Sequence, residues 1–332
     1  MTPAERVIRD RIAEHGPLTV GAFMRIAAAH YYGSRDPLGA DFTTAPEISQ
    51  MFGELIGAWC VVVWRAMGAP ARFVLAELGP GRGTLMADAL RAAQAAPEFL
   101  RAADIHLVET SPVLQAKQAE RLAGARPTWH GRFDDIPDAP LIVIANEFFD
   151  ALPVEQHVGV ELRRVAIGDD GRLVFIPTDG AIQETSPIRA QYAAELARRL
   201  AAQGGAALIV DYGPAQTTPG DSLQAVADGQ PHSVLDDPGA ADLTAHVDFA
   251  ALAAAARDAG ANVFGPVPQR SFLRRLGIEG RAAKLMAAAS RETRDSLVAA
   301  LERLIALDGM GTLFKTLALA HPALPTPPGF EP

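Results

Sequence analysis

The sequence contains a single cysteine, Cys60, among its 332 residues. One cysteine can form neither an intrachain disulfide nor a cysteine-based metal site. Cys60 lies beside Trp59 and Val63 on the apolar face of a predicted helix, which indicates an inert, packed thiol. The histidines show no H-E-x-x-H or other paired metal spacing, so we expect no bound metal.

Basic residues and long apolar runs are also scarce. The 30 basic and 39 acidic residues give a net charge of −9, and no basic run could follow a phosphate backbone, so nucleic acid is not an expected partner. No apolar run approaches the roughly 20 residues that cross a bilayer, so membrane insertion is not expected. The first residues lack a signal core and a transit-peptide composition, and the arginine- and alanine-rich composition suggests a bacterial cytoplasmic setting.

Hydrophobic periodicity predicts three parts of the chain. Residues 1–72 form a helical lid segment packed on the core, residues 73–321 an α/β domain, and residues 322–332 a flexible tail. Short apolar runs that alternate with helices in the second part are typical of a parallel sheet wrapped by helices. Helices are predicted over 2–14, 19–29, 49–67, 84–96 and 111–124. Strands are predicted over 73–78, 105–109, 141–145, 207–210 and 311–320.

Two insertions are predicted within the α/β domain. The first spans about 154–200 and begins with a hairpin over 154–177, where apolar and polar residues alternate. The second spans about 214–248 and is rich in Gly, Pro and Asp, so we expect mostly loop with a short helix. An irregular stretch over 30–50 forms a further long loop, of a kind that is often functional.

Three alternating glycines follow the first predicted strand in the run VLAELGPGRGTL. Gly79, Gly81 and Gly83 lie between a strand that ends near Glu77 and a helix that begins at Thr84. Glycines let a ligand approach the backbone, and a helix N-terminus offers unpaired N–H groups to an anionic group. The loop therefore predicts a nucleotide-like cofactor.

The glycine spacing narrows the choice of cofactor. Glu109 ends the second strand, where a carboxylate can bind both hydroxyls of a ribose, in NAD-binding folds as well as in others. However, the third glycine follows Gly81 by two positions, and not by three as in G-x-G-x-x-G. S-adenosylmethionine (SAM) has an amino-acid tail in place of a pyrophosphate, and Glu77 suits its ammonium group. The loop favours SAM, and an NAD-dependent oxidoreductase remains the alternative enzyme class.

Polar side chains also follow the third and fourth predicted strands. Asn146, Glu147 and Asp150 come after the run LIVIA, at the carboxyl edge where ligands bind in open α/β sheets. Asn146 and Asp150 could instead cap the next turn. Asp211 ends the fourth strand, and capping explains it as well as function does.

Nine blocks of sequence resemble the MidA family of methyltransferases, over about Tyr31–Lys315. They are DFTTAPEISQMFGELIGAW, ELGPGRGTL, HLVETSP, NEFFDALPVEQ, VDYG, GDSLQAV, ADLTAHVDFAAL, SFLRRLGI and MGTLFK. The resemblance implies a class I SAM-methyltransferase fold: a seven-stranded, mostly parallel Rossmann-like sheet whose last strand is antiparallel, with N-terminal helices and two insertions. The family includes a mitochondrial complex I assembly factor, which implies symmetric dimethylation of an arginine on a complex I subunit.

The resemblance also implies which residues bind SAM. The methionine part is expected near the glycine loop, the ribose at Glu109, and the adenine near Phe133 and Asp134, after a short strand near Trp129. The full set of expected cofactor residues is Glu77, Gly79, Gly81, Gly83, Thr84, Glu109, Thr110, Phe133, Asp134 and Asn146.

An arginine acceptor sets a further chemical requirement. Its guanidinium is always protonated in proteins, so carboxylates must orient it, localise its charge and help to remove a proton. The catalytic candidates are Glu147, Asp150, Glu47 and Asn146. Glu47 could equally serve a helix N-terminus.

Four residues are candidates for contact with the substrate: Tyr32, Phe148, Asp211 and His246. A lone histidine between apolar neighbours, such as His246, is more often structural. We predict a protein arginine methyltransferase with a protein substrate, such as a complex I subunit. A SAM-binding assembly chaperone without catalysis is the alternative outside enzymes.

Overall fold

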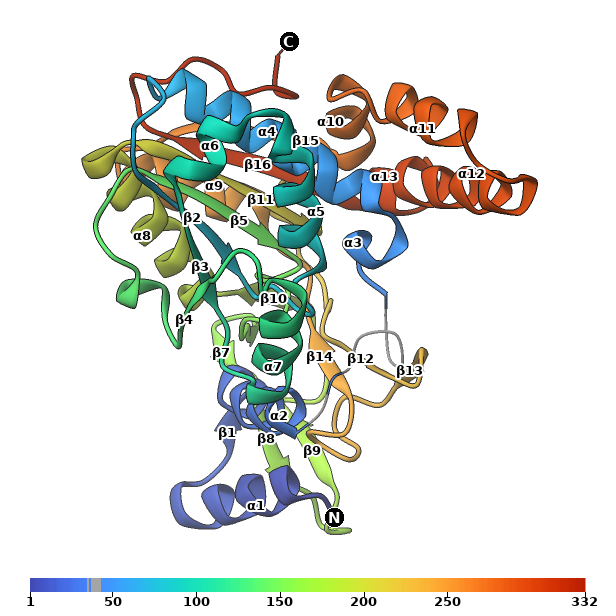
Figure 1. The fold of residues 1–332 in the computed structure, drawn as a ribbon. Helices are drawn as coiled ribbons and strands as arrows, with labels where there is room; N and C mark the ends of the chain where they lie inside the picture. Colours follow the sequence, from blue (N-terminus) through green and yellow to red (C-terminus); the bar gives the residue numbers. More distant parts are fainter. Residues whose placement is uncertain (35, 37–42, 332) are drawn as a thin grey trace.

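A seven-stranded sheet forms the centre of the protein in the computed structural model, which describes residues 1–34, 36 and 43–331 (Figure 1). Its order is β15-β16-β11-β5-β2-β3-β4. The pairs from β11 to β4 are parallel, whereas β16, the last strand in the chain, is antiparallel to both neighbours. The predicted fold class is therefore confirmed. The strands are β2 Phe73–Leu78, β3 Ala103–Val108, β4 Thr128–His130, β5 Leu141–Asn146, β11 Gly205–Tyr212, β15 Asn262–Pro268 and β16 Phe314–Ala320.

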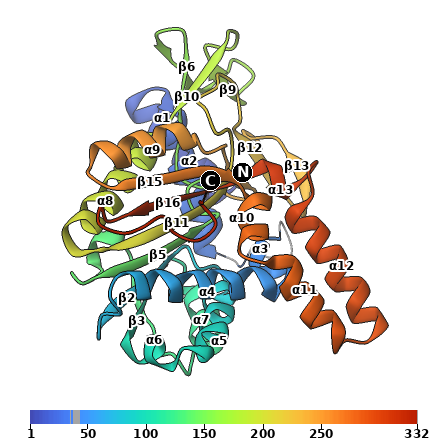
Figure 2. The same ribbon diagram turned by 90° about the horizontal axis from the view of Figure 1, so that it is seen from above.

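Helices cover both faces of this sheet (Figure 2). Alternate residues of β5 point to opposite sides, so Ile142 and Ile144 pack with α4 (Gln50–Ala66) and α5 (Thr84–Ala92). Val143 packs on the other side with α8 (Pro187–Gln203) and α9 (Phe249–Asp258). All six residues of β2 and of β5 are buried, which explains why these strands read as continuous apolar runs.

The N-terminal helices pack mainly against the insertions. α1 (Pro3–His15) is capped by Thr2, whose side chain accepts the Glu5 N–H, and α2 spans Val20–Ser34. Their apolar residues form one cluster with residues from both insertions. The short β1 (Leu18–Thr19) pairs with β8 of the first insertion. Of the irregular stretch over 30–50, residues 35 and 37–42 lie outside the described residues, and α3 occupies Ala45–Ile48.

Both insertions contain more regular structure than expected. The first holds β6 Glu155–Val158, β7 Glu161–Leu162, β8 Arg164–Ile167, β9 Leu173–Ile176 and β10 Ile182–Thr185. It ends there, because the following α8 packs on the main sheet as a crossover helix, so extending the insertion to residue 200 was wrong. The second holds a three-stranded sheet of β12 Gln224–Ala227, β13 Gln230–His232 and β14 Asp242–Thr244, where mostly loop was predicted.

Three further boundaries differ from the prediction. The helix predicted over 84–96 ends at Ala92, and after a 3₁₀ turn Pro97 begins α6 (Pro97–Ala102). The helix from Pro112, α7, ends at Arg121. The strand predicted from residue 311 is preceded by α13 (Met310–Leu313).

The C-terminal residues are packed, which corrects the predicted flexible tail. Phe330 is 9% exposed and contacts Phe272, with ring centroids 5.3 Å apart. The indole N–H of Trp59 donates to the Pro328 carbonyl at 3.2 Å. An apolar side chain and a buried donor therefore both anchor this segment.

A helical arm projects from the body on one side (Figures 1 and 2). It comprises α10 Gln269–Arg275, α11 Ile278–Ala287 and α12 Arg291–Ile305.

Within residues 1–34 and 43–331, no helix combines the length and apolarity that a membrane span requires.

Candidate functional site

A cavity of about 520 Å³ lies at the carboxyl ends of β2, β3 and β5. The glycine loop, Glu109 and Glu147 line its sheet side, and α2 and α3 close it from the N-terminal part. Of the residues that the sequence singled out, the structure brings these to the cavity wall: Tyr32, Glu47, Glu77, Gly79, Gly81, Thr84, Glu109, Thr110, Asn146, Glu147 and Phe148.

The glycine loop has the backbone conformation that favours glycine. Gly79, Gly81 and Gly83 have φ values of 62°, 54° and 76°. A Cβ atom on Gly79 would also lie 3.1 Å from Cδ2 of Phe148. Gly83 precedes the first residue of α5, so the loop leads directly into the helix N-terminus. Backbone N–H groups can therefore approach a ligand in the cavity.

The carboxyl group of Glu77 is buried, and one of its oxygens accepts no hydrogen bond from the described residues. The residue is 2% exposed, and its Oε2 has no hydrogen-bond partner among the described residues. Burial raises the pKa of Glu77 to about 8, although the Met86 N–H lowers it in part. A buried carboxyl oxygen without a donor suits the ammonium group of SAM.

Glu109 is held in place at the end of β3. Its carboxylate accepts the Ser111 N–H at 2.8 Å and the Gln118 side-chain amide at 3.3 Å. Gln118 also donates to the Gly81 carbonyl at 2.6 Å, so one amide joins the two predicted cofactor elements. Burial raises the pKa of Glu109. The arrangement leaves an acidic group fixed beside the cavity, as a ribose site requires.

Glu147 occupies an unusual backbone conformation, with φ of 50°. Its Oε1 accepts the Ala45 N–H and the Asn146 side-chain amide, both at 3.1 Å. Burial, followed by the charge of Asp150, raises the pKa of Glu147 to about 8. Non-glycine residues with positive φ are uncommon and often occur at functional sites. A carboxyl group that gains or loses its proton close to neutral pH thus lines the cavity.

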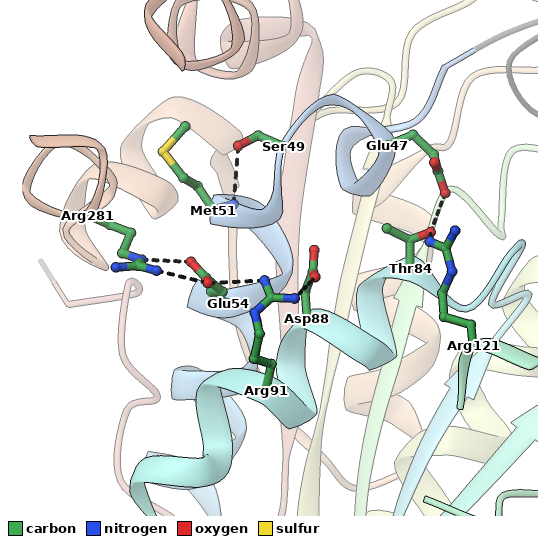
Figure 3. Close-up of polar contacts among 9 residues, drawn as sticks. All are labelled: Glu47, Ser49, Met51, Glu54, Thr84, Asp88, Arg91, Arg121 and Arg281. Carbon is green, nitrogen blue, oxygen red and sulfur yellow. Dashed lines mark hydrogen bonds and ion pairs between the residues drawn. The ribbon is translucent and has the colours of Figure 1, made fainter. Parts of the chain in front are cut away.

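Glu47 connects α3 to the N-terminus of α5, the helix that follows the glycine loop (Figure 3). Its carboxylate accepts a hydrogen bond from the Thr84 hydroxyl, and the Thr84 hydroxyl oxygen accepts one from Arg121. Glu47 lies in the first turn of α3 as well, so the helix-terminal and the cavity interpretations hold together.

A second polar network also involves α5. Glu54 of α4 accepts hydrogen bonds from Arg281 of α11 at 2.7 and 2.9 Å and from Arg91 of α5 at 3.1 Å. Arg91 also donates to Asp88 at 2.6 Å, and Figure 3 shows the side chains converging. The network fixes the base of the arm against the helix that starts at the glycine loop.

Three of the residues predicted to act on the acceptor or contact the substrate do not line the cavity. Asp211 is fully buried and accepts the N–H groups of Phe149 and Asp150 at 3.0 and 3.1 Å, so it supports the turn and is not placed to contact a substrate. Asp150 is 6% exposed behind the same turn. His246 is exposed, with its ring edge-on to Tyr212 at 5.7 Å.

The residues predicted near the adenine border a neighbouring space. Phe133 and Asp134 line a second cavity of about 330 Å³, which shares Tyr192 with the first. Phe133 is buried beneath the Arg199 guanidinium, 4.8 Å from the ring centroid. Sequence reasoning missed Tyr192 because it assigned α8 to an insertion. Among the residues that the structure describes, no group of three His, Cys, Asp or Glu side chains is arranged to hold a metal ion.

The sheet order, the antiparallel last strand and a glycine loop facing a cleft at the carboxyl edge occur together in SAM-dependent methyltransferases, and the fold and cleft assign the protein to this class. A family model of S-adenosyl-L-methionine-dependent methyltransferases matches residues 55–171 and 161–267. The chain belongs to this family, the MidA family, as the sequence resemblance indicates.

Curated relatives match almost the whole chain. The protein arginine methyltransferase NDUFAF7, mitochondrial, of Danio rerio is 37% identical over 95% of this chain and 86% of its own length. Its Homo sapiens counterpart is 36% identical over 96% and 83%. A solved Burkholderia thailandensis protein bound to S-adenosyl-homocysteine is 26% identical, covers 98% of this chain and 94% of its own, and superposes with a TM-score of 0.81. The protein is an enzyme that uses SAM.

Proposed function

We propose that this enzyme methylates arginine side chains of a protein, most specifically a respiratory complex I subunit or a similar protein. The observation that carries the proposal is Glu147, a carboxylate with a raised pKa on the cavity wall close to the glycine loop. The names of relatives at 35–37% identity support the same acceptor chemistry.

We propose the following roles in cofactor binding. Glu77 holds the ammonium group and Glu109 the ribose hydroxyls, while the glycine loop contacts the methionine part. Gly83 and Thr84 shape the start of α5. Phe133 and Asp134 border the adenine from the second cavity. The N-terminal segment acts as a lid, because α2 and α3 form one wall of the cavity.

The acceptor must be oriented and lose a proton. Bound SAM supplies an electrophilic methyl group. Glu147 binds the guanidinium, whose positive charge favours the ionised carboxylate, and accepts a proton from the attacking nitrogen as it becomes methylated. Asn146 and the Ala45 N–H fix Oε1 of Glu147, so little reorganisation is needed. Glu47 is the second carboxylate that faces the acceptor.

Glu147→Gln tests this account directly. Recombinant complex I subunits serve as acceptors with methyl-labelled SAM, and mass spectrometry identifies methylarginine. Because the amide cannot accept the proton, we expect kcat to fall by roughly 10²- to 10⁴-fold, while SAM affinity stays within about threefold. In the wild type, kcat/KM should rise with pH and level off above about 8, since Glu147 must be ionised.

Glu161→Gln, an exposed acid on the first insertion, is the matched control and should leave kcat unchanged. Full transfer by Glu147→Gln, or label on residues other than arginine, would contradict the proposal. A Glu147→Gln protein that still supports complex I assembly in cells would favour the chaperone alternative.

We also propose a bacterial cytoplasmic setting from the arginine-rich composition, whereas the relatives are named as mitochondrial.

A further inference from the structure

Arg189 is a buried cation in the first turn of α8, with 4% of its surface exposed. Its guanidinium donates to four backbone carbonyls: His246 at 2.6 Å, Asp150 at 2.8 Å, and Leu152 and Ala245 both at 3.0 Å. Burying a guanidinium costs free energy unless it is hydrogen-bonded. The four carbonyls offset that cost and fix the position of the Arg189 side chain.

These carbonyls come from two loops that are far apart in the sequence. Asp150 and Leu152 belong to the turn after β5 that also carries Glu147. Ala245 and His246 follow β14 of the second insertion. The loops also bond directly, because the Ala245 N–H donates to the Asp150 carbonyl at 3.1 Å. Arg189 therefore joins the insertion to the turn at the cavity.

The turn is held between an acidic and a basic side chain. Asp211 accepts N–H groups of Phe149 and Asp150, whereas Arg189 binds carbonyls of Asp150 and Leu152. Glu147 begins this turn with φ of 50°, a conformation that persists only where the surroundings enforce it. Asp211 through the N–H groups and Arg189 through the carbonyls supply that enforcement.

We infer that Arg189 is a positioning residue that acts through the carbonyls of Asp150 and Leu152 to hold Glu147 at the cavity. The inference deepens the proposed function and rests on the role of Glu147 there. Lysine at this position would keep the charge but lose the planar fork, so one ammonium could not serve both loops.

Arg199 provides a matched control on the same helix. It is 7% exposed and donates to the carbonyls of Phe133, Ile136 and Pro137 at 3.2, 3.0 and 2.8 Å. None of these carbonyls belongs to the turn after β5. Arg199→Lys therefore removes the same kind of contact elsewhere.

Hydrogen–deuterium exchange on the full chain tests the positioning. In Arg189→Lys, peptides over 147–152 and 243–247 should exchange roughly tenfold faster or more, while 133–137 stays protected. Arg199→Lys should give the reverse pattern. Unchanged exchange in Arg189→Lys, or the same loosened segments in both variants, would overturn the inference. Arg189→Gln is the second variant if the lysine variant does not fold.

Kinetics then separate positioning from a merely structural role. With saturating SAM and an arginine acceptor, Arg189→Lys should lower kcat by roughly 10- to 100-fold and leave the Kd for SAM unchanged. Arg199 holds the segment proposed to border the adenine, so Arg199→Lys should keep kcat at saturating SAM and raise the Kd for SAM instead. Equal kcat in wild type and Arg189→Lys would reject positioning. If the wild type methylates no arginine, the proposed function fails, and the exchange patterns alone decide whether Arg189 holds the turn.

Discussion

At the scale of single residues, the cavity is defined by buried carboxyl groups whose charge is costly. Burial raises the pKa of Glu77 and of Glu147 to about 8, so each binds a proton at neutral pH in the free protein. A cationic ligand group reverses this preference. Binding and protonation are therefore linked at both ends of the cleft.

Proton release should accompany cofactor binding. Because the SAM ammonium favours the ionised form of Glu77, we expect up to one proton to be released near pH 7, and affinity to rise with pH toward about 8. Titration calorimetry in buffers of different ionisation enthalpy counts the protons. Glu77→Gln should abolish the release. Proton release of the same size in Glu77→Gln would assign it to another group.

The sequence predicted the residues at strand ends better than those behind them. Eleven of the predicted residues line the cavity, and nine of them lie at or just after the end of a strand, where chain position alone predicts the carboxyl edge of the sheet. The other two, Tyr32 and Glu47, come from the N-terminal segment. Asp211 also ends a strand, yet it points inward to the Phe149 and Asp150 N–H groups. Which way a strand-end acid points depends on the turn of another strand, and periodicity holds no information on it.

At the scale of helices and strands, close backbone contact joins α4 to α5. A Cβ atom on Gly57 would lie 2.5 Å from the Ala89 carbonyl oxygen, and one on Gly53 would lie 2.6 Å from Cβ of Asp88. Apolar periodicity predicted a helix over 49–67, and the structure has α4 there with Ser49 as its cap. The periodicity could not show why these two positions are glycine. No element was predicted for the arm or for β15, and both became visible only in the structure.

Alanine substitutions should separate packing from helix propensity. Gly57→Ala should destabilise the protein by about 1–3 kcal/mol, because the added methyl group meets backbone and cannot be accommodated by a rotamer change. Gly280→Ala on α11 has open space and should stabilise it by up to about 1 kcal/mol. Urea unfolding measures both. Equal effects of the two substitutions would show that the α4–α5 contact is not tight.

At the scale of the whole molecule, the N-terminal helices and the two insertions form a second packed region below the sheet (Figure 1). Its contacts join residues more than a hundred positions apart, such as Leu18 and Val165. The seven-stranded, mostly parallel sheet with an antiparallel last strand followed from the family resemblance, whereas these pairings have no local signal. The same limitation hid the packing of Phe330 on Phe272.

The pH dependence of stability follows from the raised carboxyl pKa values. The folded state keeps protons on Glu77 and Glu147 between the unfolded pKa, about 4.3, and the folded pKa of about 8. Stability from these groups is therefore full at low pH and is lost as pH rises through 8. We expect Tm of the free protein to fall from pH 6 to pH 9, and Glu77→Gln to flatten the fall. A Tm that rises over this range would contradict the assigned shifts.

Calorimetric titration of the protein with SAM, S-adenosylhomocysteine and NAD tests the central claim most directly. The account predicts binding of the first two, and its loss in Gly81→Arg, where a side chain would enter the cleft and strain a φ of 54°. Gly124→Arg, at an open position outside the cavity, should bind as the wild type does. Binding of NAD alone, or of none of the three, would contradict the assignment to SAM-dependent methyltransferases.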